Sequence, residues 1–426
     1  MFLLYILPLI IIVAGVYLHV CLGFSFVLRP FCVIQKIRSS IKCKGASRSL
    51  SLSLAGTLGV GNIIGVAIGI LAGGAGSVLW LLVSSFFSVI LKYAEAALSS
   101  DMGDGGHGGL MYIIKHSFCK CGGVLSKTYA FLCMLLAFFM GAAFQTSSAV
   151  ECIKEIEPSL YIPLALLFVF AVAFVVFKGA SSIERVVSVV IPISSLVYIC
   201  LCITAIFINL NEIPHVVSTI CSSAFDFKSI GGGVLGFFTS SKIREGFLRG
   251  MLSNEAGAGT SSLAHARNPS GDPSAVGIMG AVEVIFDTVV LCTLTAIAIL
   301  VCVADTDKYE SGVALILDSV GAVFGALSEY IIVLLIFIFA FSTVICWYYY
   351  GSECYRFLFD NKKSRIYYVA FVLSVCLGSV ASLEPFVTIS DYIFLFLTAL
   401  CVLAIIKNTD RLVRLSERGG LIKRRR

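Results

Sequence analysis

One apolar stretch, Leu54 to Ile70, is broken up by glycine and carries a single amide side chain, that of Asn62. Its glycines are Gly56, Gly59, Gly61, Gly65 and Gly69. Each glycine in a helix interior costs about 1 kcal/mol relative to alanine. Irregular backbone at membrane depth is tolerated only where it lines protein or a water-filled cavity, because unpaired N–H and C=O groups are costly in hydrocarbon. The pattern therefore predicts a membrane helix interrupted at residues 59–62, where exposed main chain binds a ligand.

The rest of the chain has the composition of an integral membrane protein. Of its 426 residues, 58% are hydrophobic and 13% are charged, whereas a soluble domain carries about 25% charge. Apolar segments of about 20 residues, the length that crosses a bilayer, recur about eleven times. They are Met1–Leu28, Ser49–Ala72, Ser77–Ser99, Tyr129–Val150, Pro163–Phe177, Val186–Leu210, Gly231–Ala266, Ala275–Val303, Tyr330–Tyr350, Tyr367–Leu383 and Pro385–Ile406. We expect an all-α polytopic protein whose partner is the lipid bilayer and not a nucleic acid.

Basic residues give the chain an orientation. The loop from Lys36 to Arg48 has five basic residues and no acid, so the positive-inside rule places it in the cytoplasm. The N-terminus is then outside, and the basic C-terminal tail is cytoplasmic. The first apolar segment has neither a basic start nor a cleavage site, so we expect an uncleaved span. These features predict a multi-pass protein of the cell (inner) membrane.

A second irregular stretch, Gly231 to Ala266, resembles the first in its richness in glycine. Interrupted helices at matching positions of two inverted halves are typical of secondary transporters. We expect a peripheral N-terminal helix with its basic loop (1–46), a first repeat (47–210), a second repeat of opposite orientation (211–408) and a basic tail (409–426).

Several motifs resemble the alanine-or-glycine:cation symporter family over essentially the whole chain. They are Ala55-Gly56-Thr57-x-Gly59-x-Gly61-Asn62-Ile63, Lys92-Tyr93-Ala94-Glu95-Ala96, Arg249-Gly250-x-x-Ser253-Asn254-Glu255-Ala256-Gly257-x-Gly259, Ala264-His265-Ala266 and Phe341-Ser342-Thr343 with Trp347. The resemblance implies sodium- or proton-coupled uptake of a small neutral amino acid. It also implies a leucine-transporter-like fold of five-plus-five inverted repeats with one peripheral N-terminal helix.

A zwitterionic substrate has a carboxylate that suits the free N–H groups of a half-helix N-terminus. We expect such groups around Val60, Gly61 and Asn62, unless these glycines serve only close helix packing. The resemblance adds Gln145 and the Ser253–Asn254 pair, and Trp347 is expected to cap the pocket one turn beyond Thr343. A structural bond for Gln145 and an interfacial position for Trp347 are the alternatives. The predicted substrate-binding residues are Thr57, Val60, Gly61, Gln145, Ser253, Asn254, Thr343 and Trp347.

The coupling ion is expected at the same break. Carbonyl groups freed there, from Ala55 and Leu58, are oxygen ligands of the kind that sodium takes. The resemblance places hydroxyls of Ser342 and Thr343 beside them, unless these bond to their own helix. The predicted sodium ligands are Ala55, Leu58, Asn62, Ser342 and Thr343. No carboxylate lies inside the broken segment, which favours sodium over a proton.

Four acids, Glu95, Glu255, Glu283 and Asp287, lie in or near expected spans, where charged groups are usually paired. Their candidate partners are Lys242, Arg244 and Arg249.

We expect a transporter that imports alanine or glycine by alternating access, with no enzymatic activity and no cofactor beyond sodium. The chain has no His-Glu-x-x-His or Gly-x-Ser-x-Gly element for hydrolysis. A channel is disfavoured, because no ring of like pore-lining residues is evident. The open alternatives are a proton-coupled permease for D-alanine, serine or glutamine, and a substrate-sensing receptor on a transporter scaffold.

Overall fold

The computed structural model describes residues 5–42, 44–103, 107–225, 240–267, 272–360, 365–382 and 384–422. In this part of the chain the secondary structure is helical apart from one short strand. The α-helices of the first half are α1 (Ile6–Cys21), α2 (Ser25–Leu28), α3 (Pro30–Lys42), α4 (Lys44–Thr57), α5 (Ile64–Gly73), α6 (Ser77–Met102), α7 (Leu110–Ser117), α8 (Gly122–Leu136), α9 (Gln145–Ile156), α10 (Tyr161–Phe177), α11 (Ala180–Ile208) and α12 (Ile213–Ala224).

The second half continues with α14 (Ser241–Asn254), α15 (Ser262–Arg267), α16 (Pro273–Val284), α17 (Thr293–Cys302), α18 (Gly312–Asp318), α19 (Ala326–Leu358), α20 (Arg365–Val380), α21 (Glu384–Lys407) and α22 (Thr409–Arg418). The strand is β1 (Val323–Gly325). Short 3-10 segments are η2 (Val60–Asn62), η4 (Pro158–Leu160), η5 (Leu210–Glu212), η7 (Thr306–Lys308) and η8 (Val320–Ala322). Two π-helical segments, η3 (Ala137–Phe144) and η6 (Ile285–Cys292), join α8 to α9 and α16 to α17.

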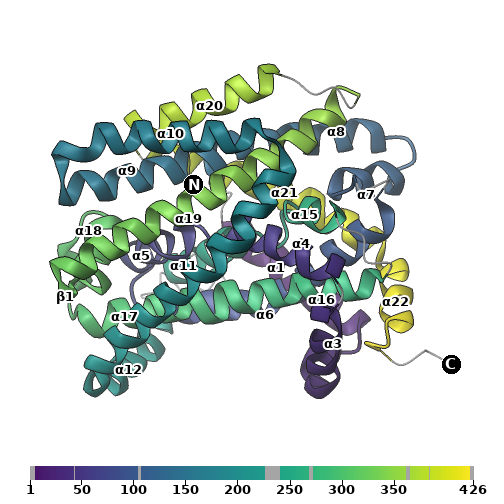
Figure 1. Ribbon diagram of the computed structural model, residues 1–426. Coiled ribbons are helices and arrows are strands. Elements are labelled where there is room, and N and C mark those ends of the chain that lie inside the picture. The colour runs from purple at the N-terminus through teal and green to yellow at the C-terminus, as the bar shows by residue number, and fades with distance from the viewer. Residues whose placement is uncertain are drawn as a thin grey trace.

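Long helices dominate the molecule. Figure 1 shows α6, α10, α16 and α19 crossing it in roughly the same direction. Within the described residues, 7 helical segments are long and apolar enough to cross a membrane, and α1, α5 and α20 are apolar but shorter. A multi-pass membrane protein is thereby supported, while the number of eleven spans stays a prediction.

Two of the long helices are poorly covered by protein. α10 exposes large apolar side chains, among them Phe170 at 69% and Phe177 at 78%, and α11 exposes Leu196 at 62%. Continuous apolar surface of this kind on long helices suits contact with lipid.

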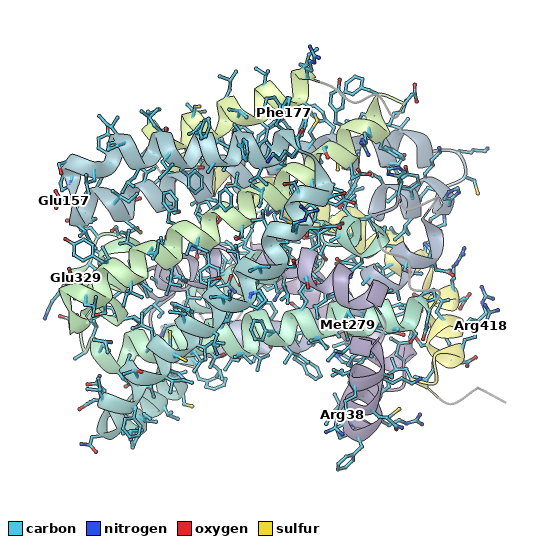
Figure 2. All side chains as sticks on the ribbon, in the orientation of Figure 1. Arg38, Glu157, Phe177, Met279, Glu329 and Arg418 are labelled. Atoms are coloured by element: carbon cyan, nitrogen blue, oxygen red, sulfur yellow. The ribbon has the colours of Figure 1, made fainter. Side chains whose placement is uncertain are left out.

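The two ends of the bundle differ in their charged residues. Figure 2 shows Glu157 and Glu329 at one end, whereas Arg418 lies at the opposite end. This separation agrees with the charge pattern along the sequence, and which end faces the cytoplasm stays a prediction. The expected glycine run Gly231–Gly233 and the tail from Lys423 to Arg426 lie outside the described residues.

Both expected helix interruptions are present. The first lies between α4 and α5, where Thr57 ends one half, η2 follows and α5 begins at Ile64. The second lies between α14 and α15, where Glu255 takes a left-handed conformation with φ 54°. α14 packs against both α5 and α6, so the two interruptions lie in the interior of one helical assembly.

Candidate substrate and cation site

The main chain at the first interruption is largely hydrogen-bonded. The N–H of Val60 donates to Oε1 of Gln145 at 3.0 Å, and the N–H of Gly59 donates to Oδ1 of Asn62 at 3.2 Å. The N–H of Asn62 donates to the carbonyl of Gly59 at 3.4 Å. The sequence predicts free amides here, and for Val60 and Asn62 that prediction is wrong, because Gln145 and the local 3-10 turn already accept their N–H groups.

Three neutral oxygen atoms lie close together at the end of α4, where the first interruption begins. The hydroxyl of Thr343 lies 3.2 Å from the carbonyl oxygen of Ala55 and 3.3 Å from that of Leu58. Both carbonyls belong to the C-terminal end of a half-helix, which carries partial negative charge. The hydroxyl oxygen and the two carbonyl oxygens are therefore ligands of the kind that a hard cation such as sodium binds.

Two other predicted sodium ligands are engaged elsewhere. The hydroxyl of Ser342 donates to the carbonyl of Ile338 on its own helix at 2.9 Å, which is the alternative that the sequence left open. The carboxamide of Asn62 accepts from Gly59 and donates to Oδ1 of Asp287 at 2.7 Å. Ser342 and Asn62 therefore bond to groups other than the Thr343 hydroxyl and the carbonyls of Ala55 and Leu58.

The second interruption is held by charged side chains. Nζ of Lys92 donates to the carbonyl of Asn254 at 2.5 Å, at the C-terminal end of α14. Glu95 accepts the N–H of Gly257, and the hydroxyl of Tyr129 donates to the carbonyl of Ala258 at 2.8 Å. Lys92, Glu95 and Tyr129 thus pair main-chain groups that the irregular segment would otherwise leave unsatisfied.

Asp287 connects the two interruptions. Its carboxylate accepts from Asn62 and, at 2.7 Å, from the hydroxyl of Ser253. Asp287 is fully buried. The first interruption therefore has a carboxylate beside it, supplied by the π-helical segment η6, although none lies within Leu54–Ile70.

Within the described residues, Glu283, Arg244 and Arg249 have other ion-pair partners than the sequence suggests. Glu283 pairs with Lys92 at 3.0 Å and also accepts from Ser53 and His265. Arg244 and Arg249 pair with Glu245 instead, at 2.8 Å and 3.3 Å. Lys92 was overlooked because it lies far from Glu283 in sequence, inside an apolar segment.

A central cavity lies between the first interruption and α14. The cavity is narrow in this structure, with a volume of about 30 Å³. It is lined by Gly56, Thr57, Gly61, Gly65, Met140, Phe144, Gln145, Arg249, Leu252, Ser253, Glu255, Val387, Ser390 and Asp391. Its wall is thus apolar on one part and polar on another, as is usual for sites that take small organic ligands.

Four predicted substrate residues line this cavity and four do not. Thr57, Gly61, Gln145 and Ser253 lie on its wall, whereas Val60, Asn254, Thr343 and Trp347 do not. Asn254 is turned away, because its carboxamide donates to Thr288 at 2.8 Å and accepts from the N–H of Ala256 at 2.9 Å.

Trp347 is fully buried on α19 and does not cap the cavity. It packs against Tyr350, with ring centroids 5.5 Å apart, and against Gly141, where a β-carbon would collide with the indole. Trp347 does lie on the same face of α19 as Thr343, but the π-helical segment η3 packs against its indole.

Sequence reasoning did not place Arg249, Ser390 and Asp391 on the wall of the cavity. Asp391 carried a usable signal, since it is an acid within the apolar segment Pro385–Ile406 and intramembrane acids are usually functional. The side of the helix that it faces could not be read from the sequence.

A wider vestibule adjoins the cavity. It has an empty volume of about 1730 Å³, open space included, and is lined by the ends of α5, α9 and α20, the start of α21 and residues 310–313. Val387 lines both the vestibule and the central cavity. The two spaces therefore share a wall residue, and α5 also lines the vestibule through Ile68 and Leu71.

Interrupted helices around an interior cavity, within a multi-pass helical assembly, define a membrane transport protein of the secondary type. The chain belongs to the sodium:alanine symporter family, whose model matches residues 1–416. This is a family of symporters and not of enzymes.

Similar curated proteins are also transporters. The chain is 32% identical over 361 residues to the sodium/alanine symporter AgcS of Methanococcus maripaludis, a match covering 81% of this chain and 77% of that one. It is 27% identical to an uncharacterized transporter of Haemophilus influenzae, covering 91% and 87% of the two chains. A probable sodium/glutamine symporter, GlnT of Bacillus subtilis, is 28% identical, covering 79% and 70%.

Proposed function

We propose that the protein imports a small neutral amino acid of the alanine and glycine class, coupled to the entry of sodium. The observation that carries the proposal is the meeting of the Thr343 hydroxyl with the carbonyls of Ala55 and Leu58, at 3.2 and 3.3 Å, beside the interruption that lines the cavity. Sodium would be held by these neutral oxygens, and the amino acid would lie against Gly61.

The proposal includes alternating access. An amino acid enters through the vestibule, passes Val387 and reaches the cavity between α5, α14 and α21. Sodium at the end of α4 and substrate at the start of α5 contact the two halves of one broken helix. Joint occupancy would therefore stabilise one arrangement of that helix, and the inverted repeats 47–210 and 211–408 would then rock around it.

Uptake into proteoliposomes tests the proposal. We expect radiolabelled alanine or glycine to accumulate when an inward sodium gradient is imposed, and to stop when sodium is replaced by potassium. Uptake that ignores both sodium and proton gradients would contradict coupling. Saturable binding without uptake would indicate a substrate-sensing receptor.

A proton is the second candidate for the coupling ion, and the position of Asp287 favours it. This acid accepts hydrogen bonds from Asn62 and Ser253, one residue from each interruption, so its protonation would change contacts at both. A proton-coupled carrier would accumulate serine, D-alanine or glutamine under an inward proton gradient without sodium, and Asp287→Asn would abolish that uptake. Unchanged sodium-driven uptake in the same variant would exclude the proton mechanism.

A further inference from the structure

Three residues of α21 form one face toward the central cavity. Val387, Ser390 and Asp391 follow the helical spacing of three and four residues, and all three line the cavity. Ser390 is 3% exposed and Asp391 is 5% exposed. A buried polar pair thus lines the cavity on α21, the helix that also borders the vestibule.

Both residues have polar atoms without a hydrogen-bond partner. Among the described residues, none bonds to Oγ of Ser390 or to Oδ1 of Asp391. The other oxygen of Asp391 forms an ion pair with Nη2 of Arg249 at 3.8 Å, a distance beyond that of a hydrogen bond. Buried polar atoms are normally satisfied, so acceptors left open in a cavity wall indicate a ligand that donates to them.

This polar pair is separated from Gly61 along the cavity. Gly65 also lines the cavity, with no atom within 4 Å of where its β-carbon would lie, and Gly69 contacts the stem of Arg249. Gly65 and Gly69 follow one another along α5, with a rise of about 6 Å for this step of four residues, and Gly61 precedes them in η2. Arg249 bonds to Glu245, one turn nearer the start of α14, so its guanidinium lies at the far end from Gly61.

We propose that Ser390 and Asp391 form a side-chain subsite for a neutral amino acid that carries a hydrogen-donating polar side chain, such as glutamine. This inference rests on the proposed function, which places the main-chain part of the substrate against Gly61. The methyl group of alanine reaches no acceptor at the other end of the cavity. A longer side chain packs its methylenes along the apolar wall of Met140 and Phe144 and donates its terminal N–H to the two open acceptors.

Specificity follows from the same geometry. A site built to hydrogen-bond a polar group rejects an analogue lacking that group, because the acceptors of the site are then left buried and unpaired. The amino acid norleucine has a chain of similar length to that of glutamine without the carboxamide. The subsite therefore distinguishes glutamine from norleucine.

Binding to the purified full-length protein in saturating sodium tests the subsite with three probes, L-glutamine, L-norleucine and L-alanine. We expect wild-type protein to bind glutamine at least tenfold more tightly than norleucine. The ratio of the two dissociation constants should approach one in Ser390→Ala/Asp391→Leu. Arg249 keeps its bond to Glu245 in this variant, but it shares that carboxylate with Arg244 and loses its ion pair with Asp391.

Thr398→Val is the matched control. Thr398 is a buried hydroxyl on the same helix, bonded to the carbonyl of Phe394 at 2.8 Å, and it does not line the cavity. Its replacement should leave the ratio unchanged. The comparison of glutamine and norleucine binding by the wild type tests the subsite even if the double variant does not fold.

Equal binding of glutamine and norleucine by the wild type would overturn the subsite while leaving the proposed function intact. Equal losses of glutamine and alanine affinity in the double variant would also overturn it, by assigning Ser390 and Asp391 to the α-ammonium group. Failure of the wild type to bind any of the three probes would refute the proposed function together with the subsite.

Discussion

The hydroxyl of Thr343 on α19 lies 3.2 Å from the carbonyl oxygen of Ala55 on α4, although the two residues are 288 positions apart in sequence. The contact joins the interrupted helix to α19. It makes Thr343 the side chain whose replacement should affect sodium most. Thr343→Val keeps the shape of the residue and removes the hydroxyl, so the sodium concentration for half-maximal uptake should rise about tenfold or more, as expected for one lost polar ligand.

Two variants serve as controls for that measurement. Thr343→Ser retains the hydroxyl and should behave nearly as the wild type. Ser342→Ala should also have little effect, because the Ser342 hydroxyl is bonded to Ile338. A shift in Ser342→Ala as large as that in Thr343→Val would show that sodium binds elsewhere.

Gly61 permits a graded test of the substrate position. A β-carbon at residue 61 would lie 3.8 Å from Cα of Ser253, an ordinary contact, so Gly61→Ala should fold and bind substrate with modestly reduced affinity. Gly61→Leu should abolish alanine binding, because the larger side chain fills the space at the cavity wall. Gly123→Leu, at an open position of α8, is the size-matched control. Normal affinity in folded Gly61→Leu protein would place the site elsewhere.

The sequence is informative where a residue type has a local consequence. Glycine and Asn62 within an apolar segment indicated an interruption at residues 59–62, and the structure has η2 there. Contacts between distant segments could not be predicted in the same way. Nothing local associates Asn62 with Asp287, 225 positions away.

Trp347 shows a related limit. Helical spacing correctly puts Thr343 and Trp347 on one face of α19, but spacing does not say what covers each turn of that face. Gly141 of η3 packs against the indole and separates it from the cavity. Asp391 could be recognised as an unusual intramembrane acid, whereas its open oxygen became evident only from the packing of α21.

The proposed orientation can be tested with natural cysteines. Cys221 on α12 and the pair Cys119 and Cys121 before α8 are exposed, and the charge pattern puts Cys221 outside and the pair inside. A membrane-impermeant maleimide should label intact cells at Cys221, so Cys221→Ser should remove most of that signal. Labelling at Cys119 and Cys121 should require permeabilised cells. The reverse pattern would show that the chain is inserted the other way round.

Lys92 should be the most sensitive charged residue for stability. Its ammonium is fully buried and lies 3.0 Å from Glu283. Removing one partner of a buried ion pair costs about 3–5 kcal/mol, because the other charge is left uncompensated. We therefore expect Lys92→Met to lower the thermal unfolding midpoint in detergent clearly, while Lys120→Met, at an exposed position, leaves it unchanged.

The double variant Lys92→Met/Glu283→Gln separates charge from packing. It removes both charges and keeps a side-chain oxygen on residue 283 for Ser53 and His265, which contact Glu283 in the wild type. If uncompensated charge is the main cost, the double variant should unfold at a higher temperature than Lys92→Met alone. A midpoint no higher than that of Lys92→Met would instead assign the main role of Lys92 to its bond with the carbonyl of Asn254, which both variants lack.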